Sequence, residues 1–259
     1  MKIAVIIIHY GSIATTKNCL LKLKAKIGSH KLILINNTQA DCSPLQTIIS
    51  DTSLVNNSSN LGFAKAVNQG ILEAKKDKSI THVFLMNNDL VISFGSFQQL
   101  LLTYSKYTQA GIVSPVLMHS LGYDWGGKYN KWSGMVKHKN WENKPKTIQT
   151  VDHVAGAGML IKLDLIDKIG MFDERFFLYF EDLDFCLRAI KSGYTIHINP
   201  DVVGEHTVSA SSNLTSRTKF QWASHFKFVN KHLFHSVYPT AYFYDLFIYP
   251  LWVLKSVLR

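Results

Sequence analysis

Acidic residues are scarce in this chain of 259 residues, which has 18 Asp and Glu against 28 Lys and Arg. The resulting formal charge of +10 favours anionic partners, namely nucleic acid, anionic lipid or phosphorylated small molecules. Nucleic acid is the weakest of these candidates, because no helix-turn-helix, RRM or zinc-finger pattern is present. We therefore predict no nucleic-acid partner.

Cysteine and long apolar runs are also scarce. Cys19, Cys42 and Cys186 form neither an even disulfide set nor a paired metal-ligand spacing, which predicts reduced thiols in a cytoplasmic protein. No apolar stretch reaches the roughly 18 residues of a spanning helix, so we expect a soluble protein or one peripheral to the inner face of the plasma membrane. The first apolar run breaks at His9 and Gly11 without a small-residue cleavage site, which predicts a buried strand rather than a secretion signal.

Apolar β-branched runs alternate with segments of helical periodicity. Strands are predicted at 2–10, 31–37, 53–57, 81–89 and 111–118, and helices at 15–27, 62–76 and 96–107. Strands that lack polar alternation and are joined by helices favour an α/β fold with a largely parallel, doubly wound sheet.

The pattern fails over 122–146, which is aromatic, glycine-rich and basic and predicts a long functional or mobile loop. Order returns as a strand and helix over 151–170 and a strand with a turn over 194–207. We predict two units, an α/β domain at 1–215 and a helical segment rich in aromatic and basic residues at 216–259.

Polar residues follow the predicted strands, and in open α/β sheets ligands bind at the carboxyl ends of the strands. For any one of these positions a simple turn is an equally good explanation. The residues are His9, Tyr10 and Gly11, Asn36 and Asn37, Asn56 and Asn57, Asn87, Asn88 and Asp89, and His206.

The segment 60–70 lacks both G-x-G-x-x-G and G-x-x-x-x-G-K-[ST], which disfavours a dinucleotide fold or a P-loop enzyme. Asn60 and Gly62 precede a predicted helix, whose free N–H groups and dipole favour an anion. Lys65 and Asn68 follow about one turn later.

Asp89 ends its strand with one certain carboxylate, which fits a divalent ion shared with a diphosphate. His206 adds a nitrogen ligand that Mg²⁺ or Mn²⁺ tolerates, although a lone histidine is more often a polar turn residue.

Three acids crowd residues 181–184, beside aromatic residues and at the start of a predicted amphipathic helix. Asp184 lies four residues before Arg188 and can pair with it, while Asp182 points elsewhere. Glu181 and Asp182 can simply complement the helix dipole. Alternatively, crowding beside aromatic rings raises the pKa of at least one carboxyl, which suits a general base.

Taken in order, several segments resemble the family 2 glycosyltransferases with the GT-A fold. They are VIIIHYG, LILINNT, NLGFAKAVNQG, VFLMNND, the long block from VAGAGMLIK to CLRAIKSGY, and GEHTVS. The closest resemblance is to the bacterial rhamnosyltransferase and galactofuranosyltransferase branch that builds cell-surface polysaccharides such as O-antigen or capsule. It covers roughly residues 2–210, and the long block is its most specific part.

The resemblance implies an inverting transfer from a dTDP- or UDP-linked sugar to a glycan or a polyprenyl-diphosphate-linked acceptor, with a divalent metal. It assigns Asp182 as the base and Asp89 and His206 as metal ligands. Asn36 falls where an aspartate that contacts the nucleotide base is usual. The implied nucleotide-sugar set is His9, Tyr10, Gly11, Asn36, Asn37, Asn60, Gly62, Lys65, Asn68, Asn87 and Asn88, and the implied acceptor set is Gly156, Ala157, Gly158, Glu181 and Asp184.

The C-terminal tail can lie at a bilayer interface or pack on the core or on a second subunit, and the sequence leaves these alternatives open. Two other functions also stay open. One is a sugar-nucleotide-binding protein without catalysis, suggested by the amides at Asn36 and Asn87. The other is a nucleotidyltransferase, for which HYGSIATTK is a poor glycine-rich loop.

Overall fold

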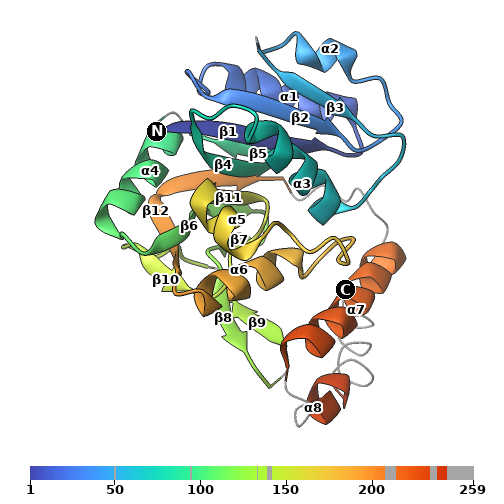
Figure 1. Cartoon of the computed structure of the whole chain (residues 1–259), viewed down its shortest axis with the longest axis vertical. Coiled ribbons are helices and arrows are strands. Elements are labelled where there is room, and N and C mark those ends of the chain that lie inside the picture. The colour runs from blue at the N-terminus through green and yellow to red at the C-terminus, as the bar shows by residue number, and fades with distance from the viewer. Residues whose placement is uncertain are drawn as a thin grey trace.

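The computed structural model describes residues 1–49, 51–93, 95–132, 134–138, 142–207, 214–233 and 238–243. Its centre is a ten-stranded mixed sheet with helices on both faces (Figure 1). The order along the main path is β10-β12-β6-β11-β4-β1-β2-β3, with β5 paired to β12 and β7 paired to β6.

The strands and helices largely follow the apolar patterns of the sequence. The strands are β1 (Lys2–His9), β2 (Lys31–Asn36), β3 (Ser53–Asn56), β4 (Ile80–Asn87), β5 (Leu90–Ile92), β6 (Ala110–His119), β7 (Gly122–Asp124), β8 (Gly127–Asn130), β9 (Met135–His138), β10 (Gln149–Val151), β11 (Gly158–Lys162) and β12 (Thr195–His206). The helices are α1 (Ile13–Lys24), α2 (Ser43–Gln46), α3 (Phe63–Ala74), α4 (Ser96–Lys106), α5 (Leu163–Ile169), α6 (Glu181–Lys191), α7 (Leu214–His232) and α8 (Tyr238–Phe243).

The first four major strands are parallel, as the βαβ pattern predicts. β1 pairs in parallel with β2 and β4, and β2 pairs in parallel with β3. β11 then runs antiparallel between β4 and β6, while β12 returns parallel to β6. The predicted mixed, mostly parallel α/β fold is confirmed.

Two apolar cores lie on the two faces of the sheet. One contains the buried sides of α3, α5 and α6, and the other those of α1, α2 and α4. β1 serves both because its side chains alternate, with Ile6 in the first core and Ile7 in the second. This double burial explains why the strands read as continuous apolar runs.

The prediction of a long loop over 122–146 is wrong for its described part. β7 pairs with the end of β6, and β8 forms an antiparallel hairpin with β9. The hairpin packs on α7, because the ring of Tyr129 meets that of Phe228 edge-on at 5.9 Å. Its short strands acquire their order from these distant partners, which explains why the local pattern shows no strand.

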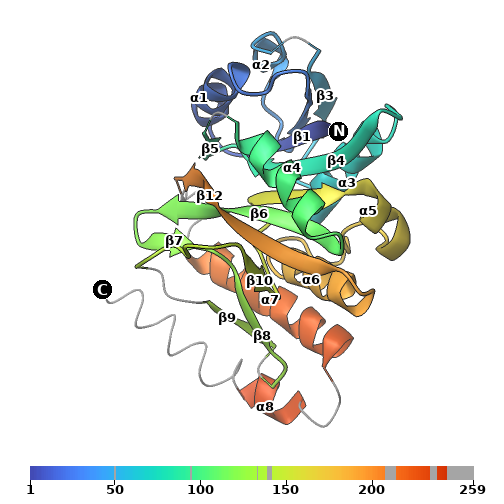
Figure 2. The same cartoon turned by 90° about the vertical axis from the view of Figure 1, so that its left-hand side faces the viewer.

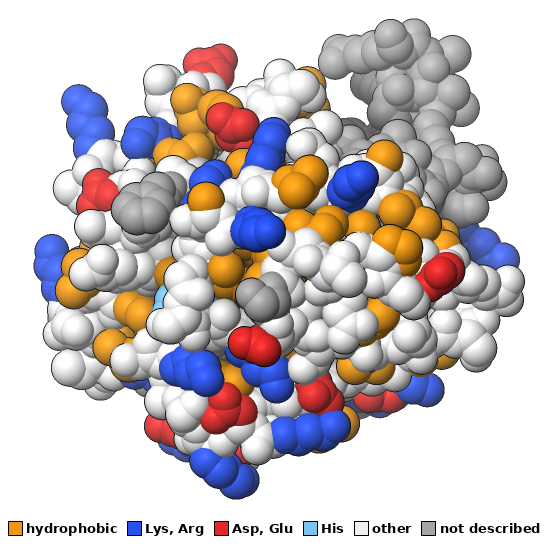
Figure 3. All heavy atoms as spheres, turned by 90° about the horizontal axis from the view of Figure 1, so that it is seen from above, with side chains coloured by type: hydrophobic (Ala, Val, Ile, Leu, Met, Phe, Trp, Pro, Cys, Tyr) orange, Lys and Arg blue, Asp and Glu red, His pale blue; other side chains and the backbone are white. Residues whose placement is uncertain are grey.

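A third apolar cluster joins the segment before α6 to α7. Phe176, Phe180, Leu183 and Phe228 are buried together there. Figures 1 and 2 place α7 and α8 at the end of the molecule opposite to α1 and α2. At the end formed by α1 and α2, Lys and Arg side chains are mixed with acidic ones (Figure 3). Among the helices that the structure describes, none is long and apolar enough to span a bilayer.

Gly62 is required where α3 begins, and we expect Gly62→Ala to be more destabilising than Gly170→Ala. Both glycines have backbone angles that side chains rarely adopt, with φ 86° and ψ 169° at Gly62 and φ 81° and ψ 171° at Gly170. A Cβ at Gly62 would lie 2.5 Å from the carbonyl oxygen of Phe177, whereas nothing lies within 4 Å of one at Gly170. Gly170→Ala should cost about 1–3 kcal/mol in unfolding free energy from its backbone alone, and Gly62→Ala about 1–3 kcal/mol more from overpacking.

Urea unfolding of both variants measures this difference. Equal losses of stability would show that the segment around Phe177 moves away from α3 at little cost.

Candidate functional site

The carboxyl ends of β1, β2 and β4 meet at one edge of the sheet. His9 is in register with Asn36, and Ile8 with Asn87. The N–H of Asn37 donates to the carbonyl of His9 at 3.0 Å, which ties the first two ends together. The polar strand ends singled out in the sequence therefore lie side by side.

Asn36 and Asn37 are buried and shape the loops around them. The amide nitrogen of Asn36 donates to the carbonyl of Ala40 at 2.7 Å and to Oδ1 of Asn56 at 3.0 Å. Asn37 donates to Oδ1 of Asn60 at 2.9 Å. Both amides thus donate to other groups of the protein, and both side chains are buried.

The start of α3 differs from the predicted anion site. The N–H groups of Leu61 and Gly62 donate to the side-chain oxygens of Asn37 and Asn60. The next N–H, of Phe63, donates to the carbonyl of Phe177 at 2.7 Å. These three N–H groups are therefore occupied by protein acceptors, so the prediction of an anion held here by Asn60 and Gly62 is not supported.

Lys65 and Asn68 have different surroundings although they are close in sequence. Lys65 is exposed. Asn68 is buried, and its amide donates to the carbonyl of Phe172 and to Glu174, both at 2.9 Å, while its oxygen accepts the N–H of Phe172 at 3.0 Å. Asn68 therefore ties α3 to the segment before α6, a role that replaces the predicted nucleotide contact.

A hydrogen-bonded chain that the sequence did not indicate lies behind the ends of β1 and β4. Nδ1 of His9 lies 2.7 Å from the hydroxyl of Thr16, which also accepts a bond from Asn88 at 2.8 Å. Asn88 donates in addition to the carbonyl of Tyr10 at 3.2 Å. Burial lowers the pKa of His9, so its ring is neutral at physiological pH. This chain holds the backbone beside Gly11, with Tyr10 exposed at the surface.

Asp89 and His206 come together although 117 positions separate them. β5 pairs with β12 so that Leu90 stands opposite His206. The carbonyl of Asp89 accepts the N–H of Thr207 at 3.1 Å, and its Oδ1 lies 3.1 Å from Nε2 of His206. A carboxylate oxygen and an imidazole nitrogen at this spacing fit a shared divalent ion. Within the described residues no third His, Cys, Asp or Glu completes such a group, so a metal here would need ligand oxygens from substrate or water.

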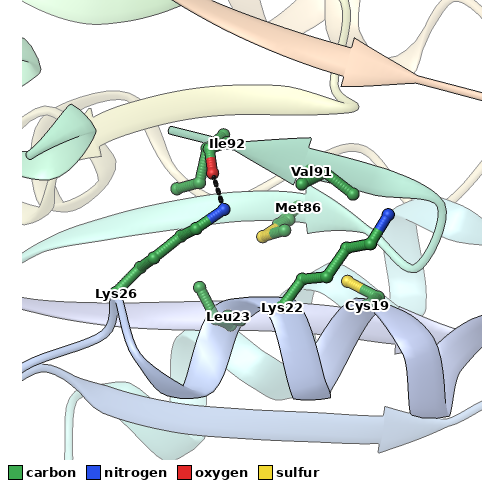
Figure 4. A pocket seen from close by; sticks show the side chains of 7 residues that line it. All are labelled: Cys19, Lys22, Leu23, Lys26, Met86, Val91 and Ile92. Carbon is green, nitrogen blue, oxygen red and sulfur yellow. Dashed lines mark hydrogen bonds between the residues drawn. The ribbon is translucent and has the colours of Figure 1, made fainter. Parts of the chain in front are cut away.

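A small hollow lies behind this pair, between α1 and β5 (Figure 4). Lys26, just after the end of α1, reaches across it and donates to the carbonyl of Ile92 at 2.5 Å. The thiol of Cys19 also faces it, and burial together with the charge of Asp89 raises the pKa of this thiol to about 12. Because the hollow has no room for a water molecule, we interpret it as imperfect packing rather than a ligand site.

Asp182 lies in the first turn of α6 and is held by several groups. Its carboxylate accepts the N–H of Gly156 at 3.1 Å and that of Leu183 at 2.8 Å, and it lies 3.4 Å from Nε2 of His153. Burial alone would raise its pKa, but the charge and hydrogen bond of His153 and these N–H groups together hold the pKa below its ordinary value. Its side chain is 20% exposed. Asp182 is therefore an ionised carboxylate that solvent or substrate can reach.

Glu181, next to it, has the opposite character. It is buried, and burial followed by the charge of Asp182 raises its pKa well above the ordinary value. Burial, and after it the neighbouring acid, thus raises the pKa of one carboxyl, but that carboxyl is not the predicted base. A buried Glu181 does not fit the predicted contact with an acceptor.

Strained backbone precedes α6. Tyr179 and Phe180 have φ values of 69° and 68°, a left-handed conformation that is uncommon for residues other than glycine. The buried ring of Phe180 packs on Phe228 of α7. This packing stabilises a turn that places Asp182 beside Gly156.

One short segment connects the two halves of the site. Gly156 donates to Asp182, and the carbonyl of Ala157, the next residue, accepts the N–H of Asn87 at 3.1 Å. Asn87 is two residues before Asp89. Gly158 is buried in β11, where a Cβ would lie 3.1 Å from Leu117. Of the three predicted acceptor residues in this turn, Gly156 is thus the one shown beside Asp182.

A comparison of the sequence with known protein families identifies the family of this chain. The sequence profile described as "Glycosyltransferase like family 2" matches residues 2–224. The chain belongs to this glycosyltransferase family.

Relatives of this family member carry transferase names. It is 24% identical over 200 residues to the low-salt glycan biosynthesis hexosyltransferase Agl10 of Haloferax volcanii, a match that covers 75% of this chain and 63% of the relative. It is 22% identical over 207 residues to the dTDP-rhamnosyl transferase RfbF of Shigella flexneri, with 80% and 69% covered. An N-acetylglucosaminyl-diphospho-decaprenol L-rhamnosyltransferase of Mycobacterium tuberculosis is 25% identical over 194 residues, with 63% and 62% covered. The chain thus spans a little under two thirds of the length of Agl10 and of the mycobacterial relative.

Solved glycosyltransferase structures share the fold. GalNAc-T7 with UDP, GalNAc and Mn²⁺ aligns with a TM-score of 0.69 at 14% identity, covering 89% of this chain and 48% of that one. The mannosyltransferase PcManGT of Pyrobaculum calidifontis, in complex with GDP-Man and Mn²⁺, aligns with a TM-score of 0.65 at 14% identity, covering 98% and 72%. The predicted GT-A fold is confirmed.

Asp184 has a structural role in this family member instead of the predicted acceptor contact. Its carboxylate is fully buried and lies 2.9 Å from Nε of Arg188, 2.6 Å from Nζ of Lys231 and 2.6 Å from Nε2 of His232. The predicted pairing with Arg188 is confirmed. The two contacts from α7 could not be predicted, because 47 and 48 residues separate the partners.

His153 is a site residue that sequence reasoning missed. Its pKa is raised because the nearby charge of Asp182 and their hydrogen bond, with a smaller contribution from Asp124, outweigh the effect of burial. A histidine shortly before the glycine-containing turn at Gly156 is the only signal for it in the sequence, and nothing local shows that it faces α6.

We expect Asp184→Asn to lower the unfolding free energy by about 3–5 kcal/mol at neutral pH, because it removes the fully buried carboxylate that pairs with Arg188 and Lys231. Asp167→Asn is the matched control, since Asp167 pairs with Lys75 at the surface and should contribute about 1 kcal/mol or less. Burial would raise the pKa of Asp184, but bonds from His232, Lys231 and Arg188 lower it overall. Its contribution is therefore present above the ordinary carboxyl pKa and is lost as pH falls through the lowered value.

Urea unfolding at several pH values measures both effects, and hydrogen exchange shows whether α7 is released first. A gap between wild type and Asp184→Asn that widened toward low pH would contradict this assignment.

Proposed function

We propose that this chain is an inverting glycosyltransferase that moves a sugar from a nucleoside-diphosphate donor to a hydroxyl of a cell-surface polysaccharide or lipid-linked glycan. The observation that carries the proposal is the ionised carboxylate of Asp182, joined through the turn at Gly156 and Ala157 to the strand end that bears Asp89. A base is thus connected to a candidate diphosphate site by a few residues.

Rhamnose is the favoured sugar, with galactofuranose as the alternative. Two of the relatives are named rhamnosyltransferases, one of them specific by name for a dTDP-linked donor. The name of the mycobacterial relative contains a polyprenyl-diphosphate-linked sugar, which supports an acceptor of that class. UDP remains the alternative carrier, since it is bound in the GalNAc-T7 structure.

In the proposed reaction, Asp182 accepts the proton of the acceptor hydroxyl as that oxygen attacks the anomeric carbon. The bond from this carbon to the diphosphate oxygen breaks on the opposite face, and its electron pair leaves with the nucleoside diphosphate. Since no covalent sugar–enzyme bond forms, a second nucleophilic carboxylate is not needed. The opposite pKa shifts of the two acids agree with this, because the pKa of Asp182 is lowered while that of Glu181 is raised, which favours Asp182 as the ionised member of the pair.

Asp89 and His206 would hold a divalent ion, Mg²⁺ or Mn²⁺. Mn²⁺ is present in the GalNAc-T7 and PcManGT structures. When bound, such an ion neutralises the charge that develops on the departing diphosphate. Asn87, whose amide lies 3.4 Å from Nε2 of His206, positions that imidazole beside Asp89.

We expect Asp182→Asn to lower transfer by about 10²–10⁴-fold, the range of a general base, while the nucleoside diphosphate still raises the melting temperature. Asp89→Ala should instead abolish the metal-dependent shift in melting temperature. The measurements are a thermal-shift panel of UDP, dTDP and GDP with Mn²⁺ or Mg²⁺, followed by transfer assays with the matching sugar donors.

Asp201→Asn is the control, because this acid is exposed on β12. A wild-type chain that binds a nucleotide but transfers and hydrolyses no donor would favour the sugar-nucleotide-binding alternative. Equal thermal shifts for wild type and Asp89→Ala would argue against the metal site.

We expect His153→Asn to move the acidic limb of the kcat/KM profile to higher pH. His153 lowers the pKa of Asp182, so its loss raises that pKa, and the base then becomes protonated at a higher pH than in the wild type. Measured pH profiles of wild type and variant test this. Lower activity with an unmoved limb would mean that His153 supports the turn without tuning Asp182.

A further inference from the structure

Helix α7 exposes one aromatic and basic face, which we call the aromatic face of α7. Its residues recur at intervals of three and four, so they share one side of the helix. Trp222 is 48% exposed and Phe226 is 52% exposed. The complete set, all exposed, is Lys219, Trp222, Ala223, Phe226, Lys227 and Asn230.

The opposite side of α7 is fully used in packing. Ser224, His225, Phe228 and Val229 are buried there. The hydroxyl of Ser224 donates to the carbonyl of Leu178 at 2.8 Å, close to the start of α6. These contacts, together with the ion pairs of Asp184, fix the rotation of the helix. Trp222 and Phe226 therefore cannot turn inward without breaking the core.

Helix α8 extends the same surface. The ring of Tyr242 stacks on that of Phe226 with centroids 5.2 Å apart, and its hydroxyl donates to Oδ1 of Asn230 at 3.1 Å. The next residue, Phe243, is 56% exposed. Three largely exposed aromatic rings thus belong to two helices that contact each other. Single exposed apolar residues need no explanation, but a group of this kind marks a contact surface.

Cations border these rings. A hollow of about 380 Å³ opens between Phe226 and the segment before α6, and it is lined by Arg175, Phe176, Phe226, Lys227 and Asn230. The ammonium group of Lys227 donates to the carbonyl of Arg175, so this contact leaves its charge uncompensated. The nearby acid Asp173 is already bound by Arg175 and by Lys231, each at 2.6 Å. The hollow therefore favours an anionic group beside an apolar one.

We propose that the aromatic face of α7, extended by Phe243, is a docking surface for a bilayer that contains anionic phospholipid. Aromatic rings are stable at headgroup depth, and Lys219 and Lys227 match the negative charge of such a surface. A second copy of the chain fits less well, because a two-fold contact would place against each other two surfaces that both carry lysines. This proposal does not depend on the transfer reaction or on the residues assigned to it.

Flotation of the full chain with vesicles tests the proposal. Vesicles of phosphatidylcholine with 30% phosphatidylglycerol, about one lipid in three, should carry the protein upward, and vesicles of phosphatidylcholine alone should do so much less. Lys219→Glu with Lys227→Glu should weaken partitioning at least about tenfold, since each lysine near an anionic surface contributes about fivefold. Trp222→Ala with Phe226→Ala should weaken it by a similar factor.

Matched controls lie elsewhere on the molecule. Leu72→Ala with Leu102→Ala removes two side chains that are each 53% exposed on α3 and α4, and Lys24→Glu with Lys78→Glu reverses two exposed cations elsewhere. Both control pairs should float like the wild type when compared at equal melting temperature. The control Lys24→Glu with Lys78→Glu could instead weaken binding as much as Lys219→Glu with Lys227→Glu. Binding would then depend on the net charge of the protein and not on the aromatic face of α7, which would overturn the proposal.

Two further outcomes would overturn the proposal. One is the absence of binding to anionic vesicles at low salt. The other is a dimer in analytical ultracentrifugation that Trp222→Ala with Phe226→Ala dissociates, which would make this face an interface between copies.

Discussion

The site depends on keeping one partly buried carboxylate ionised. Asp182 achieves this because two backbone N–H groups and His153 surround it, and together these offset the cost of burial. Its neighbour Glu181 has no comparable set of partners and carries the raised pKa. The pKa values of two adjacent acids thus shift in opposite directions because their surroundings differ, which is a common way to separate chemical roles at one site.

The position of Asp182 is in turn maintained by parts of the chain far from it. The left-handed turn at Tyr179 and Phe180 is costly on its own, and it persists because Phe180 is packed against Phe228. α7 is held in place by the buried carboxylate of Asp184, two residues after the proposed base. Helix α7 therefore forms part of the scaffold of the site. If the aromatic face of α7 contacts a bilayer, the contact between α6 and α7 has the site on one side and the membrane surface on the other.

The asparagines at the strand ends show how local polarity can mislead. Asn36, Asn37 and Asn68 sit where a ligand would be expected, yet their amides donate to other groups of the protein. Buried backbone and side-chain polar groups need partners, and in this edge of the sheet the amides provide them for one another. Asp89 and His206 differ from these amides, because a carboxylate and an imidazole at 3.1 Å can both donate electron pairs to a cation.

The sequence by itself determined the alternation of strands and helices, the parallel start of the sheet, the beginning of α6 at Glu181 and the choice of Asp182, Asp89 and His206 as the residues to examine. These features are readable because burial imposes a period on the apolar residues and because the family resemblance is carried by contiguous segments. Only the tertiary structure decided that Glu181 carries the raised pKa, that Asp184 anchors α7, that His153 faces Asp182 and that 122–146 contains strands. Each of these depends on contacts or burial set by elements distant in sequence, and no local pattern of residue types records which distant groups will meet.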